Sequence, residues 1–313
     1  MKERILVTGA TGFVGSHLVA KLDREKFDVF SLERYMTGRY VLGQAREVQT
    51  VFGDITDYYS VRQAVRMVKP DVVIHLASIS PVAYSYDHPQ EVMQTNLFGT
   101  MNLVEACLRE CPNIRQFLFA STSETYGDGP NPKTEETVQN PNSPYAVSKV
   151  ASEKYLLYVH HAMDFPATIL RNFNTYGRKN NTHFVVERAI VQMLRGDVVR
   201  LGDPSPIRDF LYVDDHVDSY LTCLNNERSV GQIFNFCTGR CVSIAELVKI
   251  IRGLTGFNGE VNWKTIPKRP WDIACLVGDY SKASRELGWK PRYELEEGLR
   301  LTVDFWKHRL AND

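Results

Sequence analysis

The sequence predicts an α/β fold: a doubly wound parallel sheet with a smaller second domain interleaved with it in the C-terminal half. Three observations support this. Short β-branched or apolar runs alternate with longer helical segments through the first half of the chain. A glycine-rich turn joins the first of these runs to the first helical segment. After about residue 171 the chain changes to turn-rich loops around short helices.

The expected elements of the first half follow from these runs. β-Branched and apolar residues predict parallel strands at 4–7, 28–31, 47–52, 72–76, 117–121 and 167–171. Helical segments fall between them, among them 12–22, 60–68, 89–111 and 145–162. Right-handed crossovers between parallel strands then produce a doubly wound sheet.

The second half is expected to carry a substrate-shaping domain. Clusters of Gly, Pro and Asn break it at 177–181, 202–204 and 267–270. The run 233–236, followed by Thr238 and Gly239, again indicates a strand, and we expect this segment near 232–239 to return to the main sheet. We therefore divide the chain into residues 1–171, for dinucleotide binding, and 172–313, mainly for substrate binding.

Composition narrows the class of protein. The 313 residues are 43% hydrophobic, and 37 basic residues balance 37 acidic ones, so no net charge favours nucleic acid or a membrane surface as a partner. No apolar stretch approaches the ~20 residues of a membrane span, and the first strand follows the start too closely for a signal peptide, so we expect a cytoplasmic protein. Six cysteines without a CxxC pair indicate neither a disulfide scaffold nor a metal site.

The segment TGATGFVG at 8–15 has the features of a dinucleotide-binding turn. It follows a strand and opens a helix, and its glycines permit a tight turn, close approach of a pyrophosphate and close packing of the helix. Free N–H groups at the helix start favour phosphate binding. The predicted cofactor contacts in this Rossmann-type turn are Gly9, Thr11, Gly12, Phe13, Val14 and Gly15.

The residues after the second and third strands bear on the choice of cofactor. Glu33 stands ~20 residues after the glycine turn, where an acidic side chain binds the adenosine ribose, and this favours NAD. Arg34 and the nearby Arg39 are alternatives that would pair with a 2′-phosphate, so NADP stays open. Asp54 and Ile55 are expected either to contact adenine or to form a helix N-terminal turn.

Tyr145 and Lys149 carry the expected oxidation chemistry. They are one helical turn apart and share a helix face. A phenol with a pKa of about 10 is a poor base at neutral pH, but a nearby ammonium favours the phenolate. Lys149 is also placed to hold the nicotinamide ribose.

With these motifs the chain resembles the extended short-chain dehydrogenases/reductases that act on nucleotide sugars. The resemblance rests on the glycine turn and on the segments 75–77, 96–103, 121–127, 143–149, 171–177 and 208–210, which together span nearly the whole chain. It implies further cofactor contacts from Leu76, Ala77, Ser78 and Asn96. It also implies a homodimer, because the helices at 89–111 and 145–162 match those that form a four-helix bundle in family members.

The resemblance implies a reaction as well. Thr122 would hydrogen-bond the sugar C4 hydroxyl, Tyr145 would take its proton, and hydride would pass from C4 to the nicotinamide. Glu124 matches the glutamate that removes the C5 proton in 4,6-dehydratases, so the expected product is a 4-keto-6-deoxy sugar. Ser123 replaces the aspartate of the deoxythymidine-diphosphate-glucose dehydratases, and the Thr-Ser-Glu order is similar to that of the GDP-mannose 4,6-dehydratases and of the UDP-N-acetylglucosamine 4,6-dehydratases that retain the C5 configuration.

The substrate contacts implied by the resemblance are Thr122, Asn174, Val185, Arg208 and Arg269, the last two gripping the diphosphate. Asn172 departs from the proline common at this position, and Arg178-Lys179 departs from the usual Pro-Arg or Pro-Gly, which indicates an atypical pocket loop.

Other functions stay open. One alternative is a nucleotide-sugar 4-epimerase, which needs no C5 base. Another is a 4-keto-6-deoxy-sugar reductase, which consumes NAD(P)H instead of recycling it within one reaction. A UDP-glucuronate decarboxylase ranks third, because the Ser-Pro-Tyr-Ala segment at 143–146 is unusual for that branch. A non-catalytic dinucleotide-binding protein on the same fold is disfavoured by the intact Thr122, Tyr145 and Lys149.

Overall fold

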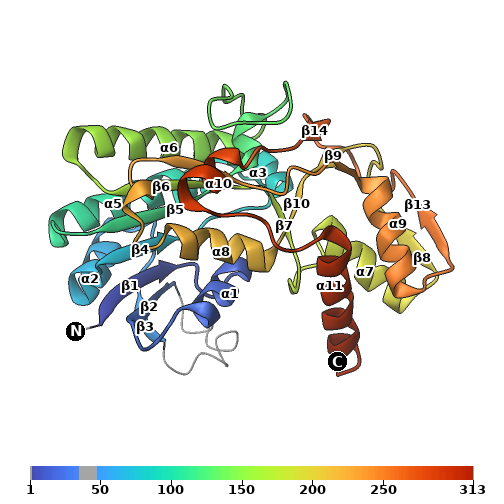
Figure 1. Ribbon diagram of the computed structural model, residues 1–313, viewed down its shortest axis with the longest axis horizontal. Coiled ribbons are helices and arrows are strands. Elements are labelled where there is room, and N and C mark those ends of the chain that lie inside the picture. Colours follow the sequence, from blue (N-terminus) through green and yellow to red (C-terminus); the bar gives the residue numbers. More distant parts are fainter. Residues whose placement is uncertain (1, 35–47, 313) are drawn as a thin grey trace.

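The computed structural model describes residues 2–34 and 48–312, and its centre is a seven-stranded sheet (Figure 1). The strand order is β11-β6-β5-β4-β1-β2-β3, and every neighbouring pair is parallel. The order reverses at β1, so the carboxyl ends of β1 and β4 flank the crevice where ligands of such sheets bind. The seven strands are β1 (Glu3–Thr8), β2 (Phe27–Glu33), β3 (Gln49–Phe52), β4 (Val72–His75), β5 (Gln116–Thr122), β6 (Ala167–Asn172) and β11 (Ile233–Phe236).

Helices cover both faces of this sheet. Apolar residues of α2 (Tyr58–Val68), α5 (Gly99–Glu110) and α6 (Pro144–Met163) form one buried cluster with the sheet. Residues of α1 (Phe13–Lys21) and α8 (Val213–Cys223) form a second cluster with the same strands. α1 and α8 lie side by side, on the opposite face from α5 and α6 (Figure 1). These near-continuous apolar strands are what a parallel sheet buried on both faces requires.

The second domain packs around a cluster of its own, built mainly from α7 (Val185–Arg195), α9 (Ile244–Thr255) and α11 (Leu295–Leu310). It stands beside the carboxyl edge of the main sheet (Figure 1). Three small sheets complete it: β7 (Asn174–Tyr176) with β10 (Phe210–Tyr212), β8 (Val198–Arg200) with β13 (Glu260–Asn262), and β9 (Ile207–Arg208) between β12 (Val242–Ser243) and β14 (Cys275–Leu276). The remaining helical elements are α3 (Val82–Asp87), α10 (Ser281–Leu287), the 3-10 turns Ser123–Tyr126 and Glu227–Ser229, and the segments described next.

The expected return of the chain to the main sheet is confirmed, since β11 pairs with β6 at the edge. The segment expected as one helix over 89–111 is instead α4 (Pro89–Met93), a π-helical turn (Gln94–Phe98) and α5. The wider turn places the buried Asn96 side chain against the backbone of Ile79 and the hydroxyl of Ser148, at 2.8 and 3.0 Å. Such turns interrupt helices where a side chain is needed at a particular point.

Two further observations concern the described part of the chain. No helix in residues 2–34 and 48–312 is long and apolar enough to cross a lipid bilayer. Within the same residues, no group of three or more His, Cys, Asp or Glu side chains is placed to hold a metal ion.

Candidate active site

A cavity of about 920 Å³ lies along the carboxyl edge of the main sheet. Residues at or just after the ends of five parallel strands line it: Gly9, Glu33, Leu76, Thr122 and Asn172. Its other wall comes from the second domain, so a ligand in it would touch both parts of the chain. This is the place where open α/β sheets bind their ligands.

Two glycines of the turn, Gly9 and Gly15, have no space for a side chain. Gly9 has φ +71°, and a Cβ atom there would lie 2.8 Å from the amide nitrogen of Ala77. At Gly15 a Cβ atom would lie 2.1 Å from the carbonyl oxygen of Gly9, which is closer than any real contact. The backbone can therefore approach a phosphate closely at the N-terminus of α1. Thr11, Gly12, Phe13 and Val14, predicted from the same motif, also line the cavity.

The residues expected at the adenosine end are brought together at the ends of β2 and β3. Glu33 accepts a hydrogen bond from the Thr11 hydroxyl at 3.1 Å through Oε2, while its Oε1 is buried without a partner. Burial raises the pKa of the Glu33 carboxyl, although its hydrogen bonds oppose the shift. Arg34 pairs with Asp54 at 2.8 Å, and Ile55 lines the cavity beside them. Arg39 lies outside the described residues.

These features fit a dinucleotide. The glycine turn offers a cradle that a Cβ would fill, and the orphan oxygen of Glu33 lies where a ribose hydroxyl would satisfy it. Leu76, Ala77 and Ser78 line the middle of the cavity. Asn96, expected as a cofactor contact, is not among the lining residues; through its bonds to Ile79 and Ser148 it fixes the loop after β4 instead.

Thr122 and Tyr145 meet at the end of β5. Thr122 closes β5 and caps the turn that follows, accepting a hydrogen bond from the Glu124 amide at 3.2 Å. Tyr145 stands in the first turn of α6, which begins with Pro144 after the N-cap Ser143. Burial raises the pKa of the Tyr145 phenol, opposed by its hydrogen bond with Thr122 and reinforced by the charge of Glu124. A sugar hydroxyl at this point would meet a threonine and a tyrosine hydroxyl together.

Lys149 lies one turn after Tyr145 and is almost fully buried. Its ammonium donates to the carbonyl oxygen of Ala120 at 2.7 Å and lies 4.8 Å from the centre of the Phe119 ring. Burial lowers the pKa of Lys149 to about 7, although the Glu153 carboxylate raises it. The lysine is therefore held by the end of β5, at the wall of the cavity.

Glu124 is buried at the base of the cavity, next to Ser123, which is also buried. Burial raises the pKa of its carboxyl, and the charges of Arg269 and Arg208 lower it in part. The two arginines share Asp272, at 3.8 Å from Arg269 and 3.2 Å from Arg208. A carboxyl whose pKa is moved toward neutral is suited to proton transfer.

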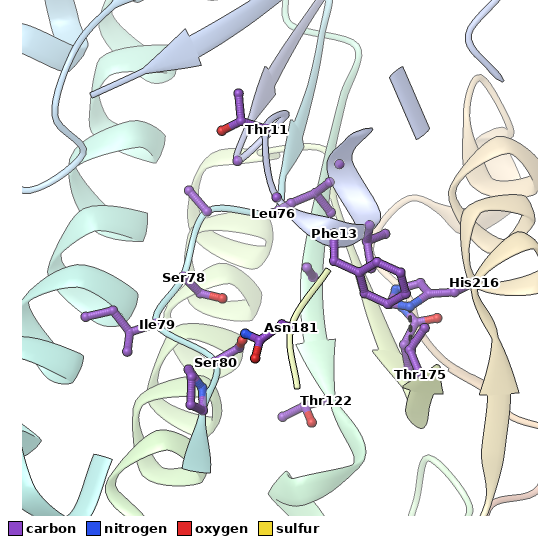
Figure 2. Close-up of a pocket in the computed structure, with 18 of the residues that line it drawn as sticks. Thr11, Phe13, Leu76, Ser78, Ile79, Ser80, Thr122, Thr175, Asn181 and His216 are labelled. Carbon is purple, nitrogen blue, oxygen red and sulfur yellow. Dashed lines mark hydrogen bonds between the residues drawn. The ribbon is translucent and has the colours of Figure 1, made fainter. Parts of the chain in front are cut away.

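The substrate contacts expected in the second domain are only partly brought together. Asn174 and Arg269 line the cavity, whereas Val185 and Arg208 do not; Arg208 acts on Glu124 through its charge. The sequence predictions also missed several lining residues of this domain: Thr175, Lys179, Asn180, Asn181, His216 and Tyr220. Figure 2 shows Thr175 hydrogen-bonded to His216 on one side of the cavity and Ser78, Ile79 and Ser80 on the other. The unusual Arg178-Lys179 pair in the sequence could have indicated that this loop lines the cavity. His216 lies inside a helical segment, and nothing in the sequence marked it as a lining residue.

The chain is similar to known proteins over nearly its whole length. The family model for GDP-mannose 4,6 dehydratase matches residues 6–302. The UDP-glucose 4-epimerase of Mycolicibacterium smegmatis is 33% identical, and the alignment covers 98% of this chain and 99% of that protein. The dTDP-glucose 4,6-dehydratase of Xanthomonas campestris pv. campestris is 32% identical, over 96% of this chain and 92% of that protein.

Solved structures agree with this similarity. The UDP-glucose 4-epimerase of Thermotoga maritima, with UDP-glucose, matches with a TM-score of 0.91 at 32% identity, covering 98% of this chain and 99% of that chain. The Thermus thermophilus enzyme of the same name, in complex with NAD, has a TM-score of 0.89 at 32% identity and covers 97% and 99%. RMD from Pseudomonas aeruginosa, complexed with NADPH, has a TM-score of 0.82 at 27% identity and covers 98% and 100%.

The fold, the dinucleotide cradle, the Thr-Tyr-Lys arrangement and these similarities lead to one conclusion. The chain belongs to the NAD-dependent epimerase/dehydratase family of extended short-chain dehydrogenases/reductases, and it is an enzyme that modifies nucleotide sugars with NAD(P).

Proposed function

We propose that this enzyme is a nucleotide-sugar 4,6-dehydratase that forms a 4-keto-6-deoxy sugar. The observation that carries the proposal is the position of Glu124, two residues after Thr122 and buried beside Tyr145, with the pKa of its carboxyl raised. A base at this point is what removal of the C5 proton requires. Simple exchange at C4 has no use for it.

We assign the proton transfers to two side chains, Tyr145 and Glu124. Thr122 orients the C4 hydroxyl, and Tyr145 takes its proton as the C4–H bond breaks. When bound, the nicotinamide would supply the hydride chemistry, from C4 and back to C6. Glu124 takes the proton from C5 and passes it to the C6 hydroxyl, which leaves as water. When hydride reaches C6, C5 takes up one proton, which is balanced by the proton that Tyr145 took from the C4 hydroxyl. Ser123, a hydroxyl of ordinary acidity, has no proton-transfer role in this sequence.

The cofactor we propose is NAD. Glu33 places a carboxylate at the end of β2, where it would attract a ribose hydroxyl and repel a 2′-phosphate. The neighbouring Arg34 is paired with Asp54, so its charge is already matched by a carboxylate. We expect Arg269 and Asn174, which line the cavity, to hold the diphosphate of the sugar nucleotide, and Arg208 to add positive charge.

A 4-epimerase is the second candidate, and the epimerases among the similar proteins are the observation that favours it. The two reactions differ in product mass. A dehydratase releases a product lighter by one water, whereas an epimerase releases a product of unchanged mass. A panel of GDP- and UDP-sugars followed by mass spectrometry and by absorbance at 340 nm separates them.

The substitution Glu124→Gln tests the proposal directly. Sugar oxidation should still occur, so absorbance at 340 nm from bound NADH should rise, while loss of water falls by about 10²–10⁴-fold because the C5 base is missing. Ser123→Ala is the matched control and should keep most of the wild-type rate. An unchanged rate of water loss in Glu124→Gln would remove Glu124 from the mechanism.

A further inference from the structure

A cluster of polar side chains lies at the carboxyl end of β6, on the α8 side of the cavity. It consists of Asn172, Thr175, His216 and Ser219, and we call it the amide cluster. Asn172 is the last residue of β6 and pairs in register with Thr122 on β5, so it stands beside the chemical site. The Ser219 hydroxyl lies 2.6 Å from the His216 carbonyl oxygen and 3.2 Å from Asn172 Oδ1, and it is the donor that these two acceptors share.

We assign the proton of the His216 ring to Nδ1 from the hydrogen bonds of Thr175. The Thr175 hydroxyl lies 3.0 Å from the carbonyl oxygen of Phe173, and we assign its single hydrogen to that bond. His216 Nδ1, 2.6 Å from the same Thr175 oxygen, is then the donor in the second pair. Burial lowers the pKa of His216 to about 3, so the ring is neutral and its Nε2 carries a lone pair. Figure 2 shows this Thr175–His216 pair.

Two complementary groups of the cluster have no partner. Asn172 Nδ2, a donor, and His216 Nε2, an acceptor, are both buried without a hydrogen bond, although both residues line the cavity. The His216 ring stacks on the ring of Tyr220, and the Tyr220 hydroxyl is also buried without a hydrogen bond. Buried polar groups are normally satisfied, so a donor and an acceptor left open on residues that line one cavity indicate a site that a ligand completes.

A primary carboxamide has one acceptor oxygen and one donor nitrogen, which matches this pair. The sheet topology indicates which carboxamide it is. The glycine turn and Glu33 would hold one half of a dinucleotide over β1 and β2, and the other half of the doubly wound sheet, β4 to β6, would receive the second mononucleotide. Asn172 ends β6, so it lies at the nicotinamide half.

We infer that Asn172 and His216 bind the carboxamide of the nicotinamide. Asn172 Nδ2 donates to the carboxamide oxygen, and His216 Nε2 accepts from its NH₂ group. Thr175 and Ser219 are positioning residues, the first for the His216 ring and the second for the Asn172 amide. Small rotations of the two side chains give the ligand access to atoms that are closed to water in the free protein.

The test compares two ligands by calorimetry on the full-length, dinucleotide-free protein: NAD, or NADP if it binds more tightly, and ADP-ribose with the same 2′ group. Asn172→Leu and His216→Phe remove the donor and the acceptor with little change in volume. Each should weaken binding of the dinucleotide about 3- to 10-fold and leave ADP-ribose unchanged, since ADP-ribose lacks the nicotinamide. Unchanged ADP-ribose binding also shows that the variants are folded. Equal weakening of both ligands, or of neither, overturns the inference.

A cofactor analogue sharpens the test. Nicotinic acid adenine dinucleotide carries a carboxylate in place of the carboxamide, so it offers His216 Nε2 no hydrogen. The wild type should therefore prefer NAD over this analogue, and His216→Phe should reduce the preference about 3- to 10-fold. Glu33→Gln, at the adenosine end, is the control and should leave the preference unchanged. A preference that stays the same in His216→Phe contradicts the inference. No sugar is present, so either result is independent of the proposed dehydration.

Discussion

The helix turn that carries Tyr145 and Lys149 places two titratable groups in an apolar wall. Burial favours the neutral form of both groups. It raises the pKa of the Tyr145 phenol and lowers the pKa of the Lys149 ammonium to about 7. The lysine keeps a carbonyl partner at 2.7 Å, which compensates in part for the lost hydration. Tyr145 and Lys149 are therefore buried at a cost in stability that depends on pH.

That cost gives a prediction at Lys149. Its pKa in the folded chain is about 7, below the ordinary value of 10.5, so the unfolded chain binds more protons between these pH values and stability gained from this group rises with pH. In Lys149→Met this position carries no titrating group, so this pH-dependent contribution to stability is absent. The free energy of unfolding of the wild type, measured by urea denaturation, should therefore increase relative to Lys149→Met from pH 7 to pH 9.5. Lys154→Met, on the exposed side of α6, is the control, and the same increase relative to both variants would contradict the prediction.

At the scale of elements, α6 is joined to β6 through a buried ion pair. Arg171 of β6 and Glu153 of α6 lie 2.6 Å apart, with side chains 3% and 1% exposed. Glu153 also accepts hydrogen bonds from Ser121 and Gln139, and Arg171 donates to the Tyr126 hydroxyl. This network fixes the distance between the helix that carries Tyr145 and the strands that end at Thr122 and Asn172.

Breaking this pair from one side should be costly. Arg171→Met leaves the Glu153 carboxylate buried without its partner, and we expect a loss of about 3–5 kcal/mol in the free energy of unfolding. The double variant Glu153→Leu/Arg171→Met should recover much of that loss, because no charge stays buried. Arg300→Met, which breaks an exposed pair with Glu296 at 3.4 Å, is the control, with an expected change of about 0.2–1 kcal/mol. Denaturant unfolding of the wild type, the single variants Arg171→Met and Glu153→Leu, the double variant and Arg300→Met measures these differences, and additive single effects would contradict the coupling.

At the scale of the molecule, one face of α6 exposes large apolar side chains to solvent. Val147 and Tyr158 lie eleven residues apart on α6, which puts them on one face, and they are 42% and 58% exposed. Phe98, on the neighbouring π-helical turn, adds a side chain that is 46% exposed. This surface fits the homodimer that the family resemblance implies, and we propose a twofold axis there.

We predict that the protein is a dimer in solution. The wild type should have twice the 35.8 kDa mass of the chain in light scattering coupled to size exclusion. Tyr158→Glu places a charge at the centre of the proposed interface and should shift the protein toward the monomer. Leu301→Glu, at a 42% exposed position on α11, is the control and should stay dimeric. A dimer that survives Tyr158→Glu with unchanged affinity places the interface elsewhere.

The sequence alone predicted the main sheet and the glycine turn, because these depend on local periodicity and on spacings within one motif. Gly9, Glu33, Tyr145 and Lys149 were predicted from such short segments and Thr122 from the family resemblance, and all five line one cavity. The π-helical turn at Gln94–Phe98 was not predicted, because its apolar pattern is that of an ordinary helix.

Only the tertiary structure decided which distant residues meet. Asn96 and Arg208 lie outside the cavity wall, and His216 lies within it, because their positions depend on how the π-helical turn Gln94–Phe98, β9 and α8 pack against the sheet. The same packing leaves Asn172 Nδ2 and His216 Nε2 open as a donor and an acceptor. Sequence spacing records neighbours along one element, whereas a ligand site is made where separate elements end side by side.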